Sequence, residues 1–527
     1  MIAIFRDYLV RHQCMSAFVV PPLPEESLGV TPPIFVQGPS AEDSASDEAM
    51  KVWLDANYPR ETKVGMLKRW RILIELERLA NDWVSGVLGT DSRPSTAGNS
   101  SSGLLARVLT FGSFRLGVIN QASDIDTLIL LPLGISRDRF FAEFPAVLSA
   151  LPEVSDCNAV ADARVPVVKA KYRGIYLDIL VARVPDKYLD PLQENIEDSL
   201  IFQVEEKCMK SMNGVRVADK ILSLVPDPAV FRSATRMIKH WAQQRGIYSN
   251  AIGYVGGVSF ALMTAKVCQL YPNLSAKQIV ERFFYTFDSW GWNENKPIML
   301  GPILDSKIPG FALNRAAQFR EWNGVKYPQD KLQPMPIITP IFPTHNTAYN
   351  VTETQKSIIL SEIKRGKEIV ELMYSTAHVE GPGRVTWDDL CSPFPFFEAF
   401  DKFIVLELTA ESDVLLLKFK GLVESRMRSF IKALEELAGV SARPHCDFFG
   451  ADYGGCFYLG LSAAREATFD LNHAVQSFYT ETMEKSLLNP EWGGGGSGFS
   501  LLVKVISAEA LRELDSLGPK VKRMRVE

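Results

Sequence analysis

The sequence is poor in the residues that build thiolate or histidine metal centres and disulfide frameworks. Its seven cysteines are scattered over 527 residues without a CxxC pair, and its six histidines form no HExxH motif. Cys446 and Cys456 lie beside His445, but their spacing is not that of zinc ligands. These absences argue against a structural zinc and are typical of reduced cysteines in an intracellular protein.

Long uncharged hydrophobic runs are also absent. The longest extends from about Ile252 to Ala265, contains three glycines and is too short to span a bilayer. Arg6, Asp7 and Arg11 interrupt the apolar N-terminal stretch, which argues against a signal peptide. We therefore expect a cytosolic or nuclear protein that does not bind a membrane.

A general excess of positive charge is missing as well. Asp and Glu outnumber Lys and Arg by 62 to 57, so the net charge is −5 and the pI is near 5.9. This balance excludes a uniformly basic nucleic-acid-binding surface, and any such contact must use a local groove or a short strand. The length predicts three or four domains.

The first ninety residues predict an arm followed by a helix. Residues 1–60 include the proline-rich stretch VPPLPEESLGVTPPI, which predicts an arm that is either extended and packed on the protein surface or partly disordered. From 61 to 88, apolar residues recur every three or four positions, which predicts an amphipathic helix. Its expected apolar face comprises Leu67, Trp70, Leu73, Leu76, Leu79, Trp83 and Val87. Residues 89–103 form a low-complexity loop.

A mixed sheet is predicted after this loop. The segments ARVLTF and DIDTLILLP are typical of strands, and a helix is expected over 137–150. Residues 165–184 predict a hairpin with Arg173 and Gly174 at its turn. Mixed strands and helices indicate an α/β or α+β unit.

The remaining chain divides into a helical part and an alternating part. Helical periodicity dominates from 198 to 368, with one helix from Pro228 to near Gly246 and another within GGVSFALMTAKVCQLYP. Beyond 369, strand-like and helical segments alternate, and a glycine loop, EWGGGGSG, precedes the last strand. This order predicts a small sheet with helices packed on it.

The segment FGSFRLGVINQASDIDTLILLP, residues 111–132, places two aspartates at the start of a buried strand. Side chains on a strand repeat every two residues, so Asp124 and Asp126 point to the same face. Neighbouring carboxylates raise each other's pKa unless a cation lies between them, and oxygen ligands suit Mg²⁺. A DxD pattern alone is also typical of a solvated strand end, which leaves both interpretations open.

Asp178 is the third candidate ligand. It lies in the middle of GIYLDILVA, whose opposite face is formed by Ile175, Leu177, Ile179 and Val181. An acid within so apolar a strand is costly unless it is paired, either with a metal or with a buried Arg or Lys. Two metal ions about 4 Å apart can activate a 3′-hydroxyl and stabilise a leaving pyrophosphate.

Gly112 and Ser113 lie between a strand and a short helical segment. Backbone N–H groups at such a helix start, together with a serine hydroxyl, can receive phosphate oxygens, and Gly112 permits a close backbone approach. This pattern predicts that the turn holds a triphosphate while the aspartates hold metals. A simple helix cap is the alternative interpretation of a lone Gly-Ser pair.

Several ordered segments resemble the eukaryotic poly(A) polymerases of the DNA polymerase β-like nucleotidyltransferase superfamily. The Gly-Ser turn followed by DxD resembles the superfamily signature, and similar segments continue in order from about residue 25 to residue 510. They include VTPPI, VPVVKAKYRGIYLDILVARV, SMNGVRVADKILSLVPD, MIKHWAQQRGIYSNAIGYVGGVSFALMTAKVCQLYPN, MPIITPIFPTHNTAYNVTETQ, FFEAFDKFIVLELTA, GLVESRMRSFIKALEEL and DLNHAVQSFYTETMEK.

The resemblance implies an α+β multidomain fold with the active site between the first two domains. After the arm of residues 1–60, which packs on the catalytic and central domains, it implies a mixed-sheet nucleotidyltransferase domain over 61–197. A mostly helical, nucleotide-binding central domain follows over 198–368. The final domain, 369–527, is implied to be an RNA-binding α/β sandwich like an RNA-recognition motif.

The resemblance also implies roles for single residues. Asp124, Asp126 and Asp178 match the metal-binding triad, and Ser113, after Gly112, matches the serine on the nucleotide phosphates. The other matched positions are Phe111 beside the base, Lys239 and Tyr248 on the triphosphate, Asn250, Gly257 and Val258 around ATP, and Asn213 and Thr339 near the base or primer end.

Each of these matches has a plain structural alternative. A mid-helix lysine such as Lys239 is ordinarily solvated, although Tyr248 and Asn250 follow soon after it, and an ammonium suits phosphates. Phe111 is by default a core residue. Gly256 and Gly257 either permit tight helix packing or let a base lie against backbone beside Val258.

Together these expectations describe a nuclear enzyme that uses two Mg²⁺ or Mn²⁺ ions. RNA would attack the α-phosphate of ATP through its 3′-hydroxyl, Asp178 would help to take the proton, and pyrophosphate would leave beside Lys239 and Tyr248. Single-stranded RNA would run between the catalytic and C-terminal domains. The acidic pI predicts weak binding of naked RNA, so we expect a monomer tethered to the pre-mRNA cleavage and polyadenylation machinery.

Two alternatives remain open from the sequence. One is a terminal nucleotidyltransferase of the same fold with another base preference, such as a uridylyltransferase, since spacing does not determine base choice. The other is an inactive RNA-binding scaffold, against which the three aspartates argue. A basic cluster at Lys520, Lys522, Arg523 and Arg525 is an import signal, an RNA contact or a solvated chain end.

Overall fold

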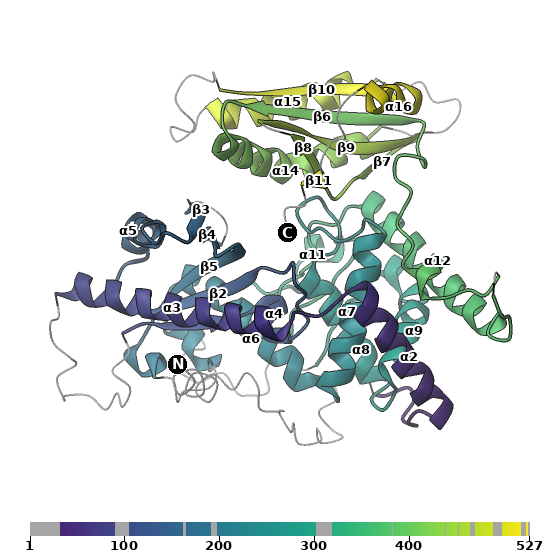
Figure 1. Ribbon diagram of the computed structural model, residues 1–527, viewed down its shortest axis with the longest axis horizontal. Helices are drawn as coiled ribbons and strands as arrows, with labels where there is room; N and C mark the ends of the chain where they lie inside the picture. Colours follow the sequence, from purple (N-terminus) through teal and green to yellow (C-terminus); the bar gives the residue numbers. More distant parts are fainter. Residues whose placement is uncertain are drawn as a thin grey trace.

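A computed structural model of the chain (Figure 1) shows a lower body of sheet and helices with a second sheet above it. It describes residues 32–89, 105–161, 165–190, 196, 198–301, 319–381, 383–437, 439–451, 453–463, 470–487, 498–517 and 523–524. Residues 90–103 of the predicted loop, the glycine run and the side chains of the terminal basic cluster lie outside the described residues. Among the described residues, no helix is long and apolar enough to cross a membrane.

The predicted extended arm contains a helix, so that prediction is wrong for residues 41–57. Helix α2 (Ala41–Asn57) begins at Ser40, whose hydroxyl accepts from the backbone N–H of Asp43 in a capping box. Helix α2 contacts the helical region. The backbone N–H of Lys277 donates to the Asp47 carboxylate at 2.7 Å.

Helix α3 (Lys63–Leu88) confirms the predicted amphipathic helix. Thr62 caps its start, and Trp70 and Trp83 are buried against the sheet. Leu67 departs from the prediction because its side chain is 52% exposed. The sheet-facing position in that turn belongs to Arg69, which is buried and pairs with Glu61 at 2.6 Å.

The first sheet is mixed, as predicted, with strand order β1-β2-β5-β4-β3. Its strands are β1 (Arg107–Thr110), β2 (Ile125–Pro132), β3 (Val154–Val160), β4 (Val167–Tyr172) and β5 (Ile175–Val184). Only β2 and β5 pair in parallel. Arg173 and Gly174, with φ of 51° and 78°, form the predicted turn between β4 and β5.

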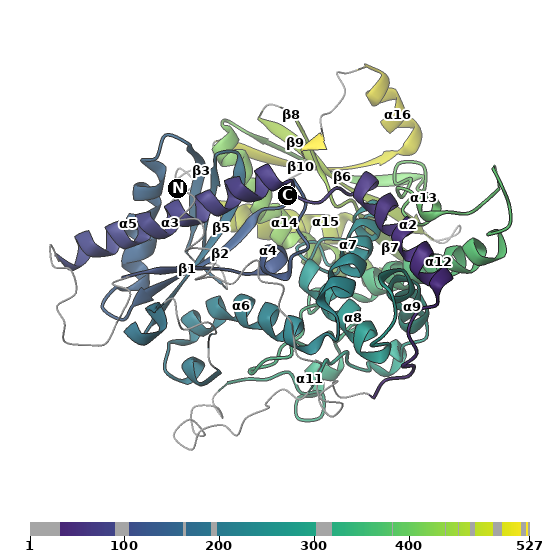
Figure 2. The ribbon, with the colours of Figure 1, turned by 60° about the horizontal axis from the view of Figure 1, so that its bottom comes forward.

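Helices cover both faces of this sheet. On one face, α3 and the predicted helix α5 (Arg137–Ser149) bury a core that includes Ile129 and Phe144. On the other face, α6 (Glu206–Leu224) packs Met209 and Met212 against the alternate residues of β2. The short helix α4 (Gly112–Leu116) lies where the sheet meets the helical region (Figures 1 and 2).

The two helices predicted for the helical region are present, as α7 (Pro228–Gln244) and α8 (Gly257–Leu270). The other main helices of this region, besides α6, are α9 (Ala276–Asp288) and α12 (Glu353–Ser375). Pro228 occupies the first turn of α7, where a missing N–H costs nothing. The short elements are η2 (Asp186–Leu189), η3 (Asp198–Phe202), η4 (Trp292–Glu294), α11 (Pro328–Lys331) and α13 (Trp387–Leu390).

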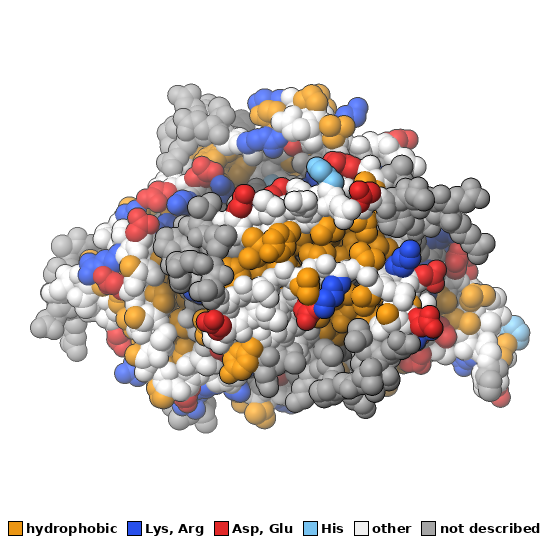
Figure 3. Space-filling model, turned by 90° about the horizontal axis from the view of Figure 1, so that it is seen from above, with side chains coloured by type: hydrophobic (Ala, Val, Ile, Leu, Met, Phe, Trp, Pro, Cys, Tyr) orange, Lys and Arg blue, Asp and Glu red, His pale blue; other side chains and the backbone are white. Residues whose placement is uncertain are grey.

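The C-terminal part forms a six-stranded sheet with order β10-β6-β9-β8-β11, and β7 pairs with β9. The predicted segments form β6 (Lys402–Ala410), α14 (Asp413–Glu435), β9 (Gly454–Ala463), α15 (Asn472–Leu487) and β10 (Phe499–Ser507). The elements that the sequence did not reveal are β7 (Val440–Pro444), β8 (Phe448–Ala451), α16 (Ala508–Leu517) and β11 (Arg523–Met524). The face seen from above carries a band of hydrophobic side chains across its middle (Figure 3).

A buried charge cluster joins this C-terminal part to the helical region. The Glu362 carboxylate on α12 accepts from Arg245 at 2.8 Å and from Arg443 of β7 at 3.1 Å. All three side chains are at least nine-tenths buried. The Tyr254 hydroxyl adds a bond to the carbonyl of Pro444 at 3.1 Å. The second sheet is therefore held on the body by satisfied, buried polar groups.

Candidate active site

The three predicted carboxylates meet at one end of the parallel strands. Asp124 lies just before β2, Asp126 lies on β2, and Asp178 lies on β5 in register with Asp126. One carboxylate oxygen from each lies within 4.8 Å of the others. Because parallel strands point their side chains in the same direction at matched positions, the strand pairing itself assembles the cluster.

Burial and mutual repulsion perturb these acids. Burial, followed by the charges of Asp124 and Asp178, raises the pKa of Asp126 well above its usual value. Burial and then Asp178 raise the pKa of Asp124, while Lys239 and Lys169 act in the opposite direction. Such a cluster fits a divalent cation with oxygen ligands, which relieves the repulsion.

Lys169 pairs with Asp178, but it is not the buried cation that the alternative interpretation of Asp178 required. Its ammonium lies 3.1 Å from the Asp178 carboxylate, but its side chain is 56% exposed. An exposed pair of this kind contributes little stability, and the pKa values of Asp124 and Asp126 stay raised despite it. The two-residue turn pairs Lys169 with Asp178 across the hairpin, so the sequence already held the signal for this neighbour.

Gly112 lies directly against the cluster. Its φ is +57°, and a Cβ built there would be 2.0 Å from Oδ2 of Asp126. Only glycine fits such a backbone next to a carboxylate. Ser113 follows at the start of α4 and is partly buried. The structure therefore brings the predicted Gly-Ser turn onto the predicted acids.

Phe111 lies between the turn and helix α6. Its ring packs so closely on Gly214 that a Cβ at this glycine would be 2.6 Å from the ring. Asn213, one residue earlier, is buried, and its amide oxygen accepts from Arg216 at 3.0 Å. Gly214 is a contributor that sequence reasoning missed, since an isolated glycine within a helix carries no distinctive pattern.

Lys239 and Tyr248 approach the acids from the helical region. The Lys239 ammonium lies 5.7 Å from the centre of the Tyr248 ring. Burial, then Tyr58, Asp124 and Asp126, raises the pKa of Tyr248, so the phenol stays protonated as a donor. Both side chains thus lie within electrostatic reach of the carboxylates, from the opposite wall of the site.

The positions after Tyr248 form an edge beside it. A Cβ at Gly257 would be 2.4 Å from the Tyr248 hydroxyl, so this glycine makes room for the phenol. Val258 is 40% exposed, and Asn250 is exposed with its carbonyl bound by Asn350 at 3.0 Å. These features leave the start of α8 open to a ligand.

Thr339 is placed differently from the other candidates. It is buried, and its hydroxyl accepts from the backbone N–H of His345 at 3.1 Å. Its backbone N–H donates to the carbonyl of the same histidine at 3.0 Å. Thr339 therefore stabilises a loop, and its role at a base or primer end stays a prediction.

The comparisons with known proteins agree with this geometry. Residues 29–225 match the family described as the poly(A) polymerase nucleotidyltransferase domain, and residues 230–391 match the poly(A) polymerase central domain. The poly(A) polymerase PAPalpha of Candida albicans is 35% identical, over 80% of this chain and 73% of its own length. The poly(A) polymerase pla1 of Schizosaccharomyces pombe is 37% identical, over 77% and 68% respectively.

More distant proteins extend the comparison. The nuclear poly(A) polymerase 1 of Arabidopsis thaliana is 33% identical, over 86% of this chain and 62% of its own length. A crystal structure of the Cid1 poly(U) polymerase superposes with a TM-score of 0.42 at 13% identity, over 66% of this chain and 99% of that one. So loose a superposition bears on no functional detail. On the sequence identities, the chain belongs to the poly(A) polymerase family.

Proposed function

We propose that this chain is a template-independent polynucleotide adenylyltransferase that adds AMP from ATP to RNA 3′ ends. The observation that carries the proposal is the assembly of Asp124, Asp126 and Asp178 on paired strands beside Gly112, in a chain of the poly(A) polymerase family. An acid cluster of this kind suits nucleotidyl transfer, in which negative charge develops on phosphate oxygens.

The residues divide the chemistry between them. Two Mg²⁺ or Mn²⁺ ions held by the three aspartates would stabilise the charge on the attacking and leaving oxygens. Asp178 Oδ accepts the proton of the RNA 3′-hydroxyl, which attacks the α-phosphate in line. Ser113 Oγ, Lys239 Nζ and Tyr248 Oη hold the triphosphate and donate to the departing pyrophosphate.

The adenine base is assigned to the edge opposite the acids. Phe111 offers an aromatic face there, and Asn250, Gly257 and Val258 offer an open edge on the helical region. Asn213 and Thr339 are assigned to the base or primer end. Stacking on a ring and contact with glycine backbone suit a planar base without selecting it by charge.

The larger arrangement follows the same proposal. We assign residues 1–60, of which 32–60 are described, to an arm, residues 61–197 to a catalytic domain and residues 198–368 to a central domain. Residues 369–527 are assigned to an RNA-binding domain like an RNA-recognition motif. The C-terminal sheet with α14 and α15 on one face supports that last assignment. The RNA strand would pass between the C-terminal and catalytic domains, held by stacking and scattered basic residues.

The cellular setting is part of the proposal. Relatives whose names include the word nuclear support a nuclear location. The net charge of −5 supports weak binding to naked RNA. We assign the chain as a monomer that is tethered to RNA by the pre-mRNA cleavage and polyadenylation machinery.

One assay tests the activity and the base choice together. The full chain is incubated with a short oligo(A) primer and Mg²⁺, with each nucleoside triphosphate in turn, and product lengths are read on a gel. Extension by ATP alone is expected. Equal extension by UTP would reduce the assignment to the wider nucleotidyltransferase class, and no extension with any nucleotide would favour an inactive RNA-binding scaffold.

A further inference from the structure

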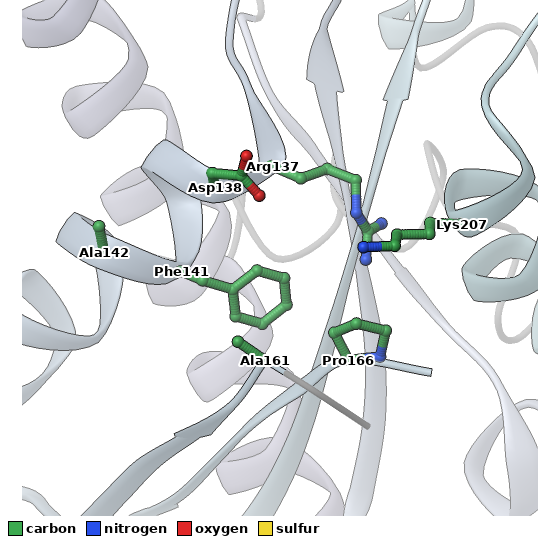
Figure 4. Close-up of a pocket in the computed structure, with 7 residues that line it drawn as sticks. All are labelled: Arg137, Asp138, Phe141, Ala142, Ala161, Pro166 and Lys207. Atoms are coloured by element: carbon green, nitrogen blue, oxygen red, sulfur yellow. The ribbon is translucent and has the colours of Figure 1, made fainter. Parts of the chain in front are cut away.

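A second charged site lies on the same sheet, away from the acids. A cavity of about 300 Å³ opens between the start of α5, the chain entering β4 and the start of α6. Figure 4 shows the Arg137 guanidinium and the Lys207 ammonium pointing toward each other above the rings of Phe141 and Pro166. Ala142, Ala161 and Asp138 complete the described lining.

Arg137 is the feature of this cavity that an ordinary surface groove lacks. Its side chain is buried, with 6% of the residue exposed. One terminal nitrogen, Nη1, donates to the carbonyl of Val181 and to Ser211 Oγ, whereas Nη2 is buried without a hydrogen-bond partner. A guanidinium cannot lose its proton, and a buried donor without a partner is destabilising.

The acids near the two cations that the structure describes are paired elsewhere or lie at the rim. Among the described residues, neither Arg137 nor Lys207 forms an ion pair, although Asp138 stands at the rim. The neighbouring glutamates are committed to other cations. Glu143 pairs with Arg139, Glu205 with Arg183 and Glu206 with Lys210, at 2.8, 2.5 and 2.8 Å.

The opposite wall of the cavity is apolar and flat. The Phe141 ring is partly buried and lies 5.8 Å from the Arg137 guanidinium carbon. Pro166 faces it across the cavity (Figure 4). A volume of about 300 Å³ is at the small end of ligand sites, which limits the occupant to one small molecule.

We propose that this cavity binds a nucleoside monophosphate. Its phosphate bonds to Arg137 Nη2 and Lys207 Nζ, and its base lies between the rings of Phe141 and Pro166. A bidentate-capable guanidinium with a second cation suits a phosphate group, and an aromatic face suits a base. The site is distinct from the acid cluster, because Asp178 lies in the first half of β5 and Arg137 contacts Val181 in the second half.

Arg137 also links the cavity to elements that carry residues of the active site. Arg137 ties α5 to β5 and, through Ser211, to α6, which carries Asn213 and Gly214 beneath Phe111. A ligand on Arg137 is therefore connected to the nucleotide side of the active site by packed elements. The proposed binding site does not depend on the proposed adenylyl transfer, because none of the residues that line the cavity takes part in that reaction.

Calorimetric titration of the full chain with AMP tests the proposal. The titration is done in EDTA, where the uncompensated aspartates repel phosphate from the catalytic site. Ala142→Trp fills the cavity from an exposed helix position, and Ala146→Trp, one turn further along α5 and outside the lining, is its matched control. AMP affinity should fall about tenfold or more in Ala142→Trp and stay unchanged in Ala146→Trp.

A second pair of variants tests the charge. Lys207→Gln should lower the affinity for AMP about tenfold. Lys210→Gln should leave this affinity unchanged, because Lys210 pairs with Glu206 in the unmodified chain. Inorganic phosphate should compete with AMP, and adenosine should bind less tightly than AMP. Absence of AMP binding to the unmodified chain, or equal binding in Ala142→Trp, would overturn the site. If inorganic phosphate bound as tightly as AMP, the proposed position of the base between Phe141 and Pro166 would be refuted.

The binding readout separates this site from the proposed enzyme. Ala142→Trp should extend oligo(A) at the unmodified rate in the absence of AMP, since Ala142 belongs to neither the acids nor the triphosphate contacts. A chain without tailing activity that still binds AMP in this pattern would refute the enzyme assignment alone. An unmodified chain that extends oligo(A) but does not bind AMP would refute the cavity alone.

Discussion

Like charges are crowded at two places on the first sheet, and they are relieved in different ways. At one end of β2 and β5, three carboxylates lie together, and burial with repulsion raises the pKa of Asp124 and of Asp126. At the second place, Arg137 and Lys207 face one cavity. A carboxylate can take up a proton when no cation is bound, but a guanidinium cannot release one. The acid cluster therefore has two ways to lose its repulsion, by binding a cation or a proton, whereas Arg137 keeps its charge and is best satisfied by an anion.

A third example completes the comparison. Lys266 is buried within α8, and burial followed by the charge of Lys296 lowers the pKa of Lys266 to about 8. Here burial of a cation is relieved because the cation can lose its proton near pH 8. The three cases separate residues that titrate, residues that bind a metal and residues that need a ligand.

The largest expected effect comes from neutralising the most perturbed acid. Asp126→Asn should slow oligo(A) extension about a thousandfold, because several kcal/mol of charge stabilisation depend on this carboxylate. In EDTA the same variant should be more stable than the unmodified chain, since one repelling charge is gone. Gel assays and urea unfolding measure the two effects.

Asp156→Asn is the matched control for that variant. Asp156 is exposed on edge strand β3 of the same sheet, and Asn tolerates its positive φ of 53°. Its extension rate and stability should stay close to those of the unmodified chain. If Asp126→Asn destabilised the metal-free protein, the acids would be cooperating in the fold rather than repelling.

A smaller effect is expected at the glycine against the acids. Gly112→Ala places a Cβ 2.0 Å from Asp126 Oδ2, so the carboxylate must move, and extension should fall about tenfold to a hundredfold. Gly174→Ala has the same backbone strain, with φ of +78°, but meets nothing within 4 Å. It should lose only about 1 kcal/mol of stability and keep its activity. Equal activity of the two variants would contradict the assigned closeness to the acids.

Ligand-induced stabilisation should distinguish the two charged sites. At about a hundred times its dissociation constant, Mg²⁺ should add about 2.7 kcal/mol to the free energy of unfolding, and far less in Asp126→Asn. Inorganic phosphate should stabilise the unmodified chain more than it stabilises Lys207→Gln. Urea unfolding in crossed combinations checks both. If the stabilisation by phosphate persisted in Lys207→Gln but disappeared in Asp126→Asn, phosphate would bind at the acid cluster and not in the basic cavity.

The smallest expected effect concerns Lys266. The unfolded chain keeps this proton up to about pH 10.5, whereas the folded chain releases it near pH 8. Stability therefore rises with pH in this window, since the unfolded state binds more protons. Relative to Lys266→Met, the unmodified chain should gain about 1 kcal/mol between pH 8 and pH 9. A constant difference between the two proteins in urea unfolding would show that Lys266 does not titrate there.

The sequence was most informative where local rules control the structure. The turn at Arg173 and Gly174 fixes the register of β4 with β5, and the alternation around Asp178 gives the face of that acid. Helix α7 follows from Pro228 and its apolar period. The acid triad was predictable because strand periodicity, combined with the family resemblance, leaves few other arrangements.

Tertiary contacts set the limits of that prediction. Helix α2 was missed because the prolines before it dominated the pattern, although Ser40 and Asp43 are a readable capping box. The exposure of Leu67 depends on how Arg69 meets Glu61. No sequence spacing connects the residues that line the basic cavity, which are Arg137, Asp138, Phe141, Ala142, Ala161, Pro166 and Lys207. Such a site exists only once the sheet and its helices have packed.

The cluster around Glu362 has a practical consequence for anyone who divides this chain. A fragment ending at residue 391, where the central-domain match stops, would lack Arg443 and the carbonyl of Pro444. Arg245 would then be the one remaining cation for the Glu362 carboxylate among its described partners, and Tyr254 would lose the acceptor for its hydroxyl. The C-terminal sheet thus supplies hydrogen-bond partners to buried groups of the helical region, and shortened versions of the chain should include this sheet.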